Sequence, residues 1–499
     1  MAPSLSPARA RDEGERPSPA RAAPRVGVGF SPRARATAVV LVLAALAVGC
    51  GGGGGASGEP GEAYGDAVPP ERPVVELAFD VAPDLRSVTG TETVRFTPDL
   101  EVCELVFRAW PNTPTMATAG SSLTVTDATV GEAPVAPEVT AAGAPAGAPG
   151  TMITLPLPGC VAPGTTVTAR LGFRLVLGVD ADERVASSPS TGTAWFGSGY
   201  PLLAWERGRG WAREPAVPIF GESATSEDAD TTVTVTAPAG LVVLGPGVAE
   251  PVTEGPPGRA VHGFRAPAVR DVAIAVGRYA VQERDVDGVR LRLATPQTGT
   301  RVPPAQWADA LAAAITAQSR LLGPFPYAEL AVAITPGQSD GTEFPGALQF
   351  GDVGARQLRA LVAHEVAHQW FYGLVGNDQA RDPWLDESFA TAVEALTADG
   401  DYSADDVDPA LVGRLGDPMT AWAADGGFRA YVDGVYEQGA AALLAGRAAD
   451  PEGFDAALRG YVATNAHRVV TPAAVREAFA GQPAVIDALT EAGAFTGGR

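Results

Sequence analysis

The chain has 499 residues, with 36 Lys or Arg, 58 Asp or Glu, four His and three Cys. Apolar residues make up 46% and charged residues 19%, so the chain can bury a core and is not disordered as a whole. The formal net charge of −22 argues against a nucleic-acid partner. Three Cys without a C-x-x-C pair exclude a zinc ribbon, an iron–sulfur protein and a dense disulfide scaffold.

Residues 1–49 are typical of a signal peptide. An Arg-containing start is followed by an uncharged apolar run at 36–48, which is shorter than the ~20 residues that a membrane-spanning helix needs. The sequence Ala-Val-Gly-Cys at 47–50 resembles a bacterial lipobox, which implies cleavage before Cys50 and lipidation of that residue. Residues 50–72 would then form a flexible tether. The alternative is an ordinary signal peptide cleaved nearby, with Cys50 incidental.

These features predict an exported chain. We expect a lipoprotein at the outer face of the bacterial cytoplasmic membrane, with a secreted protein as the alternative. Because that compartment is oxidising, the two remaining cysteines, Cys103 and Cys160, are expected to form a disulfide. The alternative is two separate buried thiols.

Residues 73–284 are predicted to form an N-terminal antiparallel β-domain. Similar Val/Thr alternation recurs along this part with Pro and Gly between the segments, and no segment has a convincing helical period. The clearest alternation of apolar with polar or small residues is at Val75, Leu77, Phe79 and Val81, and further examples lie at 122–126, 165–175 and 231–236.

Residues 285–499 are predicted to be mainly helical with a small sheet. Apolar residues at helical spacing follow Pro303-Pro304 and stop at Gly323-Pro324. A strand is expected at 329–335. Helical patterns then cover 354–370, 386–398, 434–448, 453–464 and 472–490. The predicted fold class is therefore α+β with more than one domain.

The residues from His364 to His368 have the pattern His-Glu-x-x-His and predict a metal site. Residues four apart on a helix share one face, so the two imidazoles can converge on one ion while Glu365 reaches its water. A catalytic zinc needs a third protein ligand, and Glu387 follows at the start of the next helical pattern. The alternative is a chance pentapeptide. The remaining histidines are expected to be structural or surface residues: His262 and His467.

Further motifs surround this pattern in order along the chain. His-Gln-Trp-Phe at 368–371 and Trp-Leu-Asp-Glu at 384–387 flank the ligands, Gly-Thr-Glu-Phe-Pro-Gly precedes them at 341–346, and Val-Tyr-Glu-Gln-Gly follows at 435–439. Together with Phe-Arg-Ala-Trp-Pro-Asn at 107–112, these motifs resemble the gluzincin zinc metallopeptidases of the aminopeptidase N / leukotriene-hydrolase family. The resemblance covers about residues 73–480.

The resemblance implies an N-terminal β-domain followed by a thermolysin-like, mainly helical catalytic domain. Since about 60 residues follow Tyr436, we expect no large C-terminal helical domain and an open cleft that tolerates longer peptides. One Zn²⁺ per chain would be bound by His364, His368 and Glu387, with Glu365 as general base.

Further roles follow from the resemblance alone. Tyr436 would donate a hydrogen bond to the oxyanion, and Glu343 would pair with the free α-ammonium of a peptide. Tyr431 and Glu394 would be auxiliary residues, the latter orienting a ligand. Departures from the family pattern affect the expected substrate preference and lie at Thr342, Gly373 and Gln438.

The expected function is zinc-dependent hydrolysis of the N-terminal peptide bond of peptides outside the cytoplasmic membrane. The expected partners are peptide substrates and, through the lipid anchor, the membrane. Two alternatives stay open. A thermolysin-type zinc endopeptidase is disfavoured by Glu343, and a catalytically idle peptide-binding lipoprotein is disfavoured by the presence of the ligands, Glu365 and Tyr436.

Overall fold

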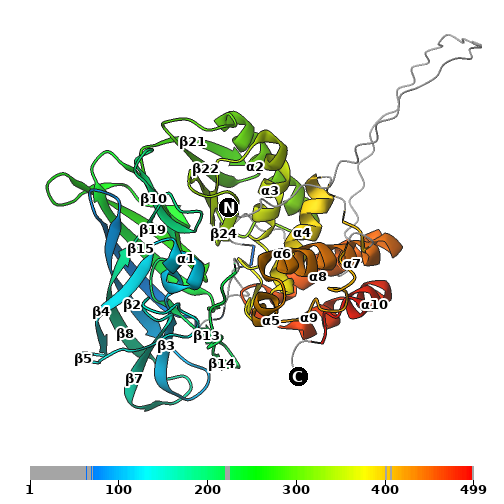
Figure 1. The fold of residues 1–499 in the computed structure, drawn as a ribbon, viewed down its shortest axis with the longest axis horizontal. Helices are drawn as coiled ribbons and strands as arrows, with labels where there is room; N and C mark the ends of the chain where they lie inside the picture. The colour runs from blue at the N-terminus through cyan, green and yellow to red at the C-terminus, as the bar shows by residue number, and fades with distance from the viewer. Residues whose placement is uncertain are drawn as a thin grey trace, which may run out of the picture.

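The computed structural model describes residues 63–64, 69, 71–219, 225–398, 400, 402–404 and 407–496. The predicted signal peptide, Cys50 and nearly all of the predicted tether lie outside the described residues. Among the helices that are described, none has the length and apolar character needed to cross a membrane. Figure 1 shows a β-rich part, coloured blue to green, beside a mainly helical part, coloured yellow to red.

The N-terminal part is a β-rich domain, as predicted. Its largest sheet has the order β17–β19–β15–β1–β2–β8–β4–β5, with β18 on β19, and its only parallel pair among the described strands is β1 with β15. Alternate side chains of β1 are buried, which is the predicted period of two. The strands are β1 (Val74–Val81), β2 (Ser87–Phe96), β4 (Ser122–Val130), β5 (Ala133–Pro134), β8 (Val167–Val176), β15 (Ala229–Pro238), β17 (Val248–Ala249), β18 (Thr253–Glu254) and β19 (Arg259–Val269).

Smaller sheets and two short helical turns complete this domain. One sheet has the order β12–β3–β7–β6, another has the order β16–β20–β11–β10–β9, and β13 pairs with β14. Their bounds are β3 (Val102–Arg108), β6 (Glu138–Thr140), β7 (Met152–Val161), β9 (Gly178–Val179), β10 (Val185–Ser188), β11 (Thr193–Gly197), β12 (Leu202–Leu203), β13 (Trp205–Glu206), β14 (Gly210–Trp211), β16 (Val242–Leu244) and β20 (Ala273–Gly277), with η2 (Trp110–Asn112) and α1 (Pro114–Thr118).

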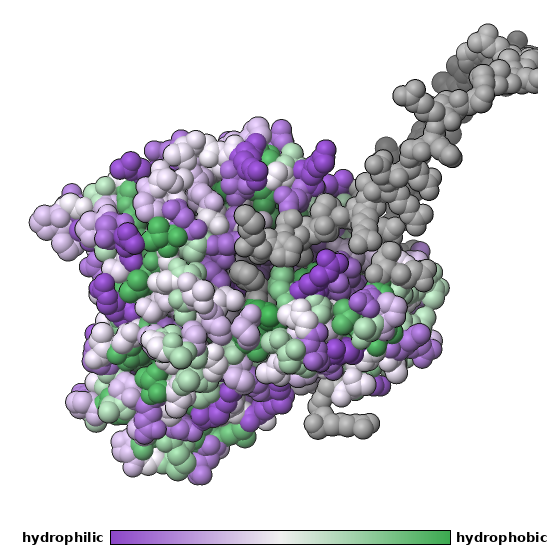
Figure 2. Space-filling view, in the orientation of Figure 1, coloured by the Kyte–Doolittle hydropathy of each residue, from purple (hydrophilic) through white to green (hydrophobic). Residues whose placement is uncertain are grey.

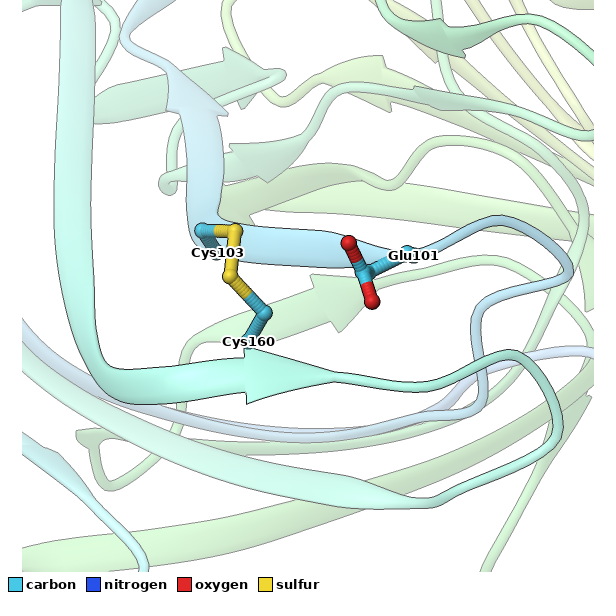
Figure 3. Close-up of side chains that lie close together, drawn as sticks. All are labelled: Glu101, Cys103 and Cys160. Carbon is cyan, nitrogen blue, oxygen red and sulfur yellow. A yellow bond between two sulfur atoms is a disulfide. The ribbon is translucent and has the colours of Figure 1, made fainter.

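A disulfide joins two strands of the β-domain. Cys103 in β3 is bonded to Cys160 in β7, the pair that the sequence analysis singles out, and the two lie 57 residues apart in sequence. Figure 3 shows Glu101 beside this bridge. Because both sulfurs are in the disulfide, the group has no thiolate to offer a metal ion.

The second domain begins with a mixed sheet of order β21–β22–β23–β25–β24. The predicted boundary between residues 284 and 285 falls inside β21, and this strand pairs along its whole length with β22. Residues 279–284 therefore pack with the second domain, because strand pairing outweighs the local shift in composition. The strands are β21 (Tyr279–Val286), β22 (Val289–Pro296), β23 (Glu329–Ile334), β24 (Gly341–Phe344) and β25 (Ala347–Phe350).

Helices form most of the remaining chain. The pattern at 434–448 starts as a π-helical segment, and the pattern at 472–490 is divided in two before Pro483, which has no N–H to continue a helix. The elements are α2 (Pro304–Leu322), α3 (Ala355–Ala367), β26 (Gly376–Asn377), α4 (Trp384–Ala398), α5 (Met419–Ala424), α6 (Gly427–Tyr431), η4 (Val432–Glu437), α7 (Gln438–Ala449), α8 (Pro451–Asn465), β27 (Val469–Val470), α9 (Pro472–Ala478) and α10 (Pro483–Glu491).

The two domains meet through small side chains. The sheet that contains β11 and β20 packs against the sheet that contains β23, β24 and β25, and the alanine-rich cluster between them lets the backbones approach closely. The larger residues of this cluster include Trp195 and Phe344. On the outer face seen in Figure 2, by contrast, hydrophobic residues form small patches among hydrophilic ones.

A buried ion pair also joins the domains. Arg270 Nη2 of the β-domain lies 2.8 Å from Asp228 Oδ1, and both side chains are almost fully buried. Arg270 Nε donates to the Gly373 carbonyl in the second domain, and the other oxygen of Asp228 lies 2.7 Å from His467 Nδ1. His467, expected to be structural or exposed, is thus a structural residue of the domain interface.

We predict that Arg270→Leu lowers the free energy of unfolding by about 3–5 kcal/mol, because it leaves a buried aspartate without its main counter-charge. Chemical denaturation measures the change. The matched control is Arg265→Leu, since the ion pair of Arg265 with Glu250 is exposed and its loss should cost less than about 1 kcal/mol. Equal effects of the two substitutions would contradict this assignment.

Candidate active site

The zinc-binding pattern lies at the end of α3. Leu358, Leu361 and Val362 pack into the core, and His364 and His368 follow one turn apart on a buried face. Helix α4 packs against α3 and brings Glu387, in its first turn, to the same place. All three predicted ligands are therefore buried together at one helix–helix contact.

The three candidate ligand atoms form a nearly equilateral triangle. His364 Nε2 lies 3.1 Å from His368 Nε2, and each lies 3.3 Å from Glu387 Oε2. Ligands 2.0–2.1 Å from a tetrahedral zinc ion lie about 3.3 Å from one another. Glu387 Oε2 is buried and accepts no hydrogen bond from the described residues. The donor set and its spacing thus fit a zinc ion with one open position.

The other ring nitrogens of the histidines also have partners. His368 Nδ1 lies 3.1 Å from the Phe371 carbonyl, which can only accept, so Nδ1 carries a proton and Nε2 is the nitrogen that faces the other two candidate ligands. His364 Nδ1 lies 3.4 Å from Glu394 Oε2, and Tyr402 donates a hydrogen bond to the other oxygen of Glu394. Glu394 therefore lies where an orienting carboxylate is expected.

The electrostatics of the ligands favour a bound cation. Burial lowers the pKa of His368, but the carboxylates of Glu343 and Glu387 outweigh it and raise this pKa to about 10. Burial raises the pKa of Glu387, but His368 and His364 outweigh it and hold this pKa well below its usual range. The pocket of carboxylates therefore stabilises positive charge at the ligand triangle.

The motif at 341–346 forms β24 and the turn that follows it. Pro345 and Gly346 occupy the centre of the turn, and Gly346 has the positive φ of 68° that such a turn requires. Gln369, directly after the zinc helix, accepts from the Gly346 N–H and donates to the Phe344 carbonyl. This buried amide fixes the hairpin against α3.

The hairpin places Glu343 beside the general-base candidate. The ligand atoms of Glu343, Glu365 and His368 lie within 4.8 Å of one another. Glu343 Oε1 and Glu365 Oε2 are buried and have no hydrogen-bond partner among the described residues. Burial, and then Glu343, raises the pKa of Glu365, although His364 opposes this. A positive charge between the two carboxylates would offset the free-energy cost of burying them.

Gly341 gives Glu365 its space. A Cβ at Gly341 would overlap the Glu365 carboxyl group, so a side chain at this position would displace the candidate base. The clearance depends on a contact between residues that are far apart in sequence. The motif is visible in the sequence, but this function of its first glycine is not.

Tyr436 lies in the π-helical segment η4, and its ring stacks on that of His364 at a centroid distance of 5.7 Å. Tyr431 meets Tyr436 edge to face at 5.4 Å. Burial and then Glu387 raise the pKa of Tyr436 well above its usual value, so its hydroxyl keeps its proton at neutral pH. The segment is held close to α4, because Ser388 donates to the Val435 carbonyl.

The residues that depart from the family pattern have local partners. Thr342 accepts from Gln338 Nε2, and Gln438 Nε2 donates to the Gly434 carbonyl. Gly373 has no room for a Cβ beside the Gln369 carbonyl. The remaining histidine, His262, pairs across β19 and β15 with Val235.

Two histidines from one helix and a glutamate from the next are a ligand set that zinc metallopeptidases use. Residues 352–417 match the family described as the peptidase family M1 domain. A stretch of 39 residues is 59% identical to aminopeptidase N of Oryctolagus cuniculus and a stretch of the same length is 56% identical to that of Rattus norvegicus. Each match covers 8% of this chain and only 4% of the relative.

Solved structures with the same fold cover most of the chain. An M1 zinc metallopeptidase from Deinococcus radiodurans matches with a TM-score of 0.59 and 22% identity, over 85% of this chain and 95% of that one. A mutant of it bound to a Tyr-Ser-Ala substrate matches with a TM-score of 0.59 and 20% identity, over 85% and 94%. The comparisons confirm the resemblance to M1 peptidases: the family model and the two aminopeptidases N match short stretches of the chain, and the solved structures share its fold.

We predict that Glu394→Ala weakens zinc binding by about 10- to 100-fold, because His364 loses the carboxylate that orients its ring. Competition with a chromophoric chelator measures the dissociation constant. The matched control is Glu452→Ala, which removes an exposed side chain of α8 and should leave zinc binding unchanged. If Glu394→Ala bound zinc as tightly as the control, the orienting role of Glu394 would be wrong.

Proposed function

We propose that this chain is a zinc aminopeptidase that hydrolyses the N-terminal peptide bond of peptides outside the cytoplasmic membrane. The observation that carries the proposal is the second buried carboxylate. Glu343 Oε1 has no hydrogen-bond partner among the described residues and lies within 4.8 Å of the ligand atoms of Glu365 and His368. A buried carboxylate without a partner is costly unless a cation completes it.

The free α-ammonium of a peptide is the cation that fits this place. If Glu343 binds the ammonium, the first peptide bond lies next to Glu365 and the ligand triangle, and no earlier residue can be accommodated. Strand β24 lies at the edge of its sheet and pairs only with β25 among the described strands. An extended peptide can pair with such a free edge, which would align it along Glu343.

In the proposed reaction, Glu365 transfers a proton from the attacking water to the leaving amine. A zinc ion at His364, His368 and Glu387 supplies Lewis-acid activation when it is bound. Glu365 takes the proton of the attacking water on its unpaired oxygen and later gives it to the leaving amine. Glu365 is held for this by α3 and by the clearance at Gly341.

Tyr436 is proposed to stabilise the charge that develops on the scissile carbonyl oxygen. Its ring lies against His364, and its hydroxyl is protonated because burial and Glu387 raise its pKa. A donor of this kind is typically worth about 3–4 kcal/mol in the transition state. Tyr431 supports the ring of Tyr436 from the side.

The cellular location is part of the proposal. Residues 1–49 have the pattern of a signal peptide, and Cys50 ends a sequence that resembles a lipobox. The disulfide between Cys103 and Cys160 is in keeping with an oxidising compartment. We therefore place the catalytic domain at the outer face of the membrane, with secretion as the alternative.

We predict that Glu365→Gln lowers kcat by about 10²- to 10⁴-fold, because the general base is lost. The variant should retain one zinc ion per chain, since Glu365 is not a ligand. Aminoacyl reporter kinetics and metal analysis measure these two properties, and removal of zinc by a chelator should abolish wild-type turnover. Wild-type kcat in Glu365→Gln would contradict the proposed proton route.

We predict that N-acetylation of a peptide blocks its cleavage and that Glu343→Gln lowers kcat/KM for free-amine reporters by about 10- to 150-fold, the value of one charged hydrogen bond. The control is Glu477→Gln, which changes an exposed side chain of α9. Cleavage of acetylated peptides at full rate would instead indicate an endopeptidase. Binding of zinc and peptide without any turnover would indicate an idle binding protein.

A further inference from the structure

The strand that bears Glu343 has two faces with different partners. Side chains alternate across a strand, so Gly341 and Glu343 face the zinc helix while Thr342 and Phe344 face away from it. The face turned away from zinc meets the β-domain. In Figure 1, β24 lies between the two parts of the molecule.

Phe344 is the first contact across this boundary. Its ring is almost fully buried and lies directly on the backbone of Gly197 in β11, where an added Cβ would overlap the ring. The guanidinium group of Arg184 lies over the same ring at a centroid distance of 6.0 Å and over that of Trp110 at 4.9 Å. The β-domain thus packs closely around Phe344, the residue next to Glu343.

The second contact lies just before β24. Asp182 accepts hydrogen bonds from the Ser339 N–H at 2.7 Å and from the Ser339 hydroxyl at 2.6 Å. Gly337 packs against the Trp195 ring, and an added Cβ there would lie 2.7 Å from the Ala181 carbonyl oxygen. The segment before Glu343 is therefore held by the same part of the β-domain as the segment after it.

These contacts matter because β24 is held weakly within its own sheet. It spans only Gly341–Phe344 and lies at the sheet edge, with β25 as its partner. An edge strand of four residues has few backbone hydrogen bonds of its own. The position of Glu343, at its third residue, then depends on Gln369, which holds the hairpin against α3, and on the β-domain contacts at the two ends of the strand.

We propose that Asp182 and Gly197 of the β-domain are positioning residues for Glu343, so that recognition of the substrate α-amine depends on the contact between the domains. This inference rests on the proposed function. Neither residue is a candidate zinc ligand or general base. Each acts through β24, Asp182 by holding Ser339 and Gly197 by admitting the Phe344 ring.

The test compares an aminoacyl reporter with its des-amino analogue, in which hydrogen replaces the α-amino group. The ratio of the two kcat/KM values measures amine recognition separately from the chemistry. Gly197→Ala should displace the Phe344 ring, and Asp182→Ala should release Ser339. In both full-length variants we expect the ratio to fall at least tenfold through a rise in KM for the free-amine reporter, with cleavage of the des-amino analogue within twofold of wild type.

The matched controls are Gly159→Ala, where an added Cβ meets nothing within 4 Å, and Asp487→Ala, which removes an exposed side chain of α10. Circular dichroism establishes that each variant is folded, and its zinc content establishes that the metal site is occupied. Because Asp182 is only partly buried, Asp182→Ala decides the test if Gly197→Ala does not fold.

The inference is overturned if folded variants keep the wild-type ratio, or if both substrates lose activity equally. The proposed function has a separate outcome. A wild-type enzyme that cleaves both reporters equally well, or a Glu343→Gln variant that keeps the preference for the amine, would refute amine binding by Glu343. Loss of the preference in Glu343→Gln but not in the interface variants would refute only the positioning role.

Discussion

The close approach of three ligand atoms is the constraint on which the site depends. His364 Nε2, His368 Nε2 and Glu387 Oε2 lie 3.1–3.3 Å apart in a buried place, where a lone pair or carboxylate without a cation is costly. The packing of α3 against α4 imposes this arrangement, and the Phe371 carbonyl and Glu394 fix the rings within it. Folding thus prepares a site that a zinc ion completes.

The two domains have different functions in the proposed site. The helical domain contains the ligands, the candidate base and the candidate oxyanion donor, whereas the β-domain contacts the strand that bears Glu343. The interface combines alanine-rich sheet packing with the buried pair of Arg270 and Asp228, so it can hold β24 in one position. On this account, the alignment of the first peptide bond at the zinc site depends on the contact between the domains as well as on the Glu343 carboxylate.

Local patterns made part of this structure predictable. The spacing of His364 and His368 is that of one helical turn, and the alternation at β1 is that of a half-buried strand, so both follow from short segments of sequence. Contacts between distant segments were predictable only where a motif or a cysteine pair marks them, as for Glu387 and for Cys103 with Cys160. Asp228 meets His467 across 239 residues, and pairing with β22 rather than composition decides that β21 belongs to the second domain. The π-helical register that presents Tyr436 has no simple sequence signal either.

Anomalous X-ray diffraction at the zinc edge, from crystals of the zinc-loaded chain, tests the central claim most directly. The account predicts one strong peak within about 2.0–2.2 Å of both Nε2 atoms and of the Glu387 carboxylate, with a fourth position left to solvent. A peak bound by other residues, or imidazoles that point away from a common centre, would contradict it.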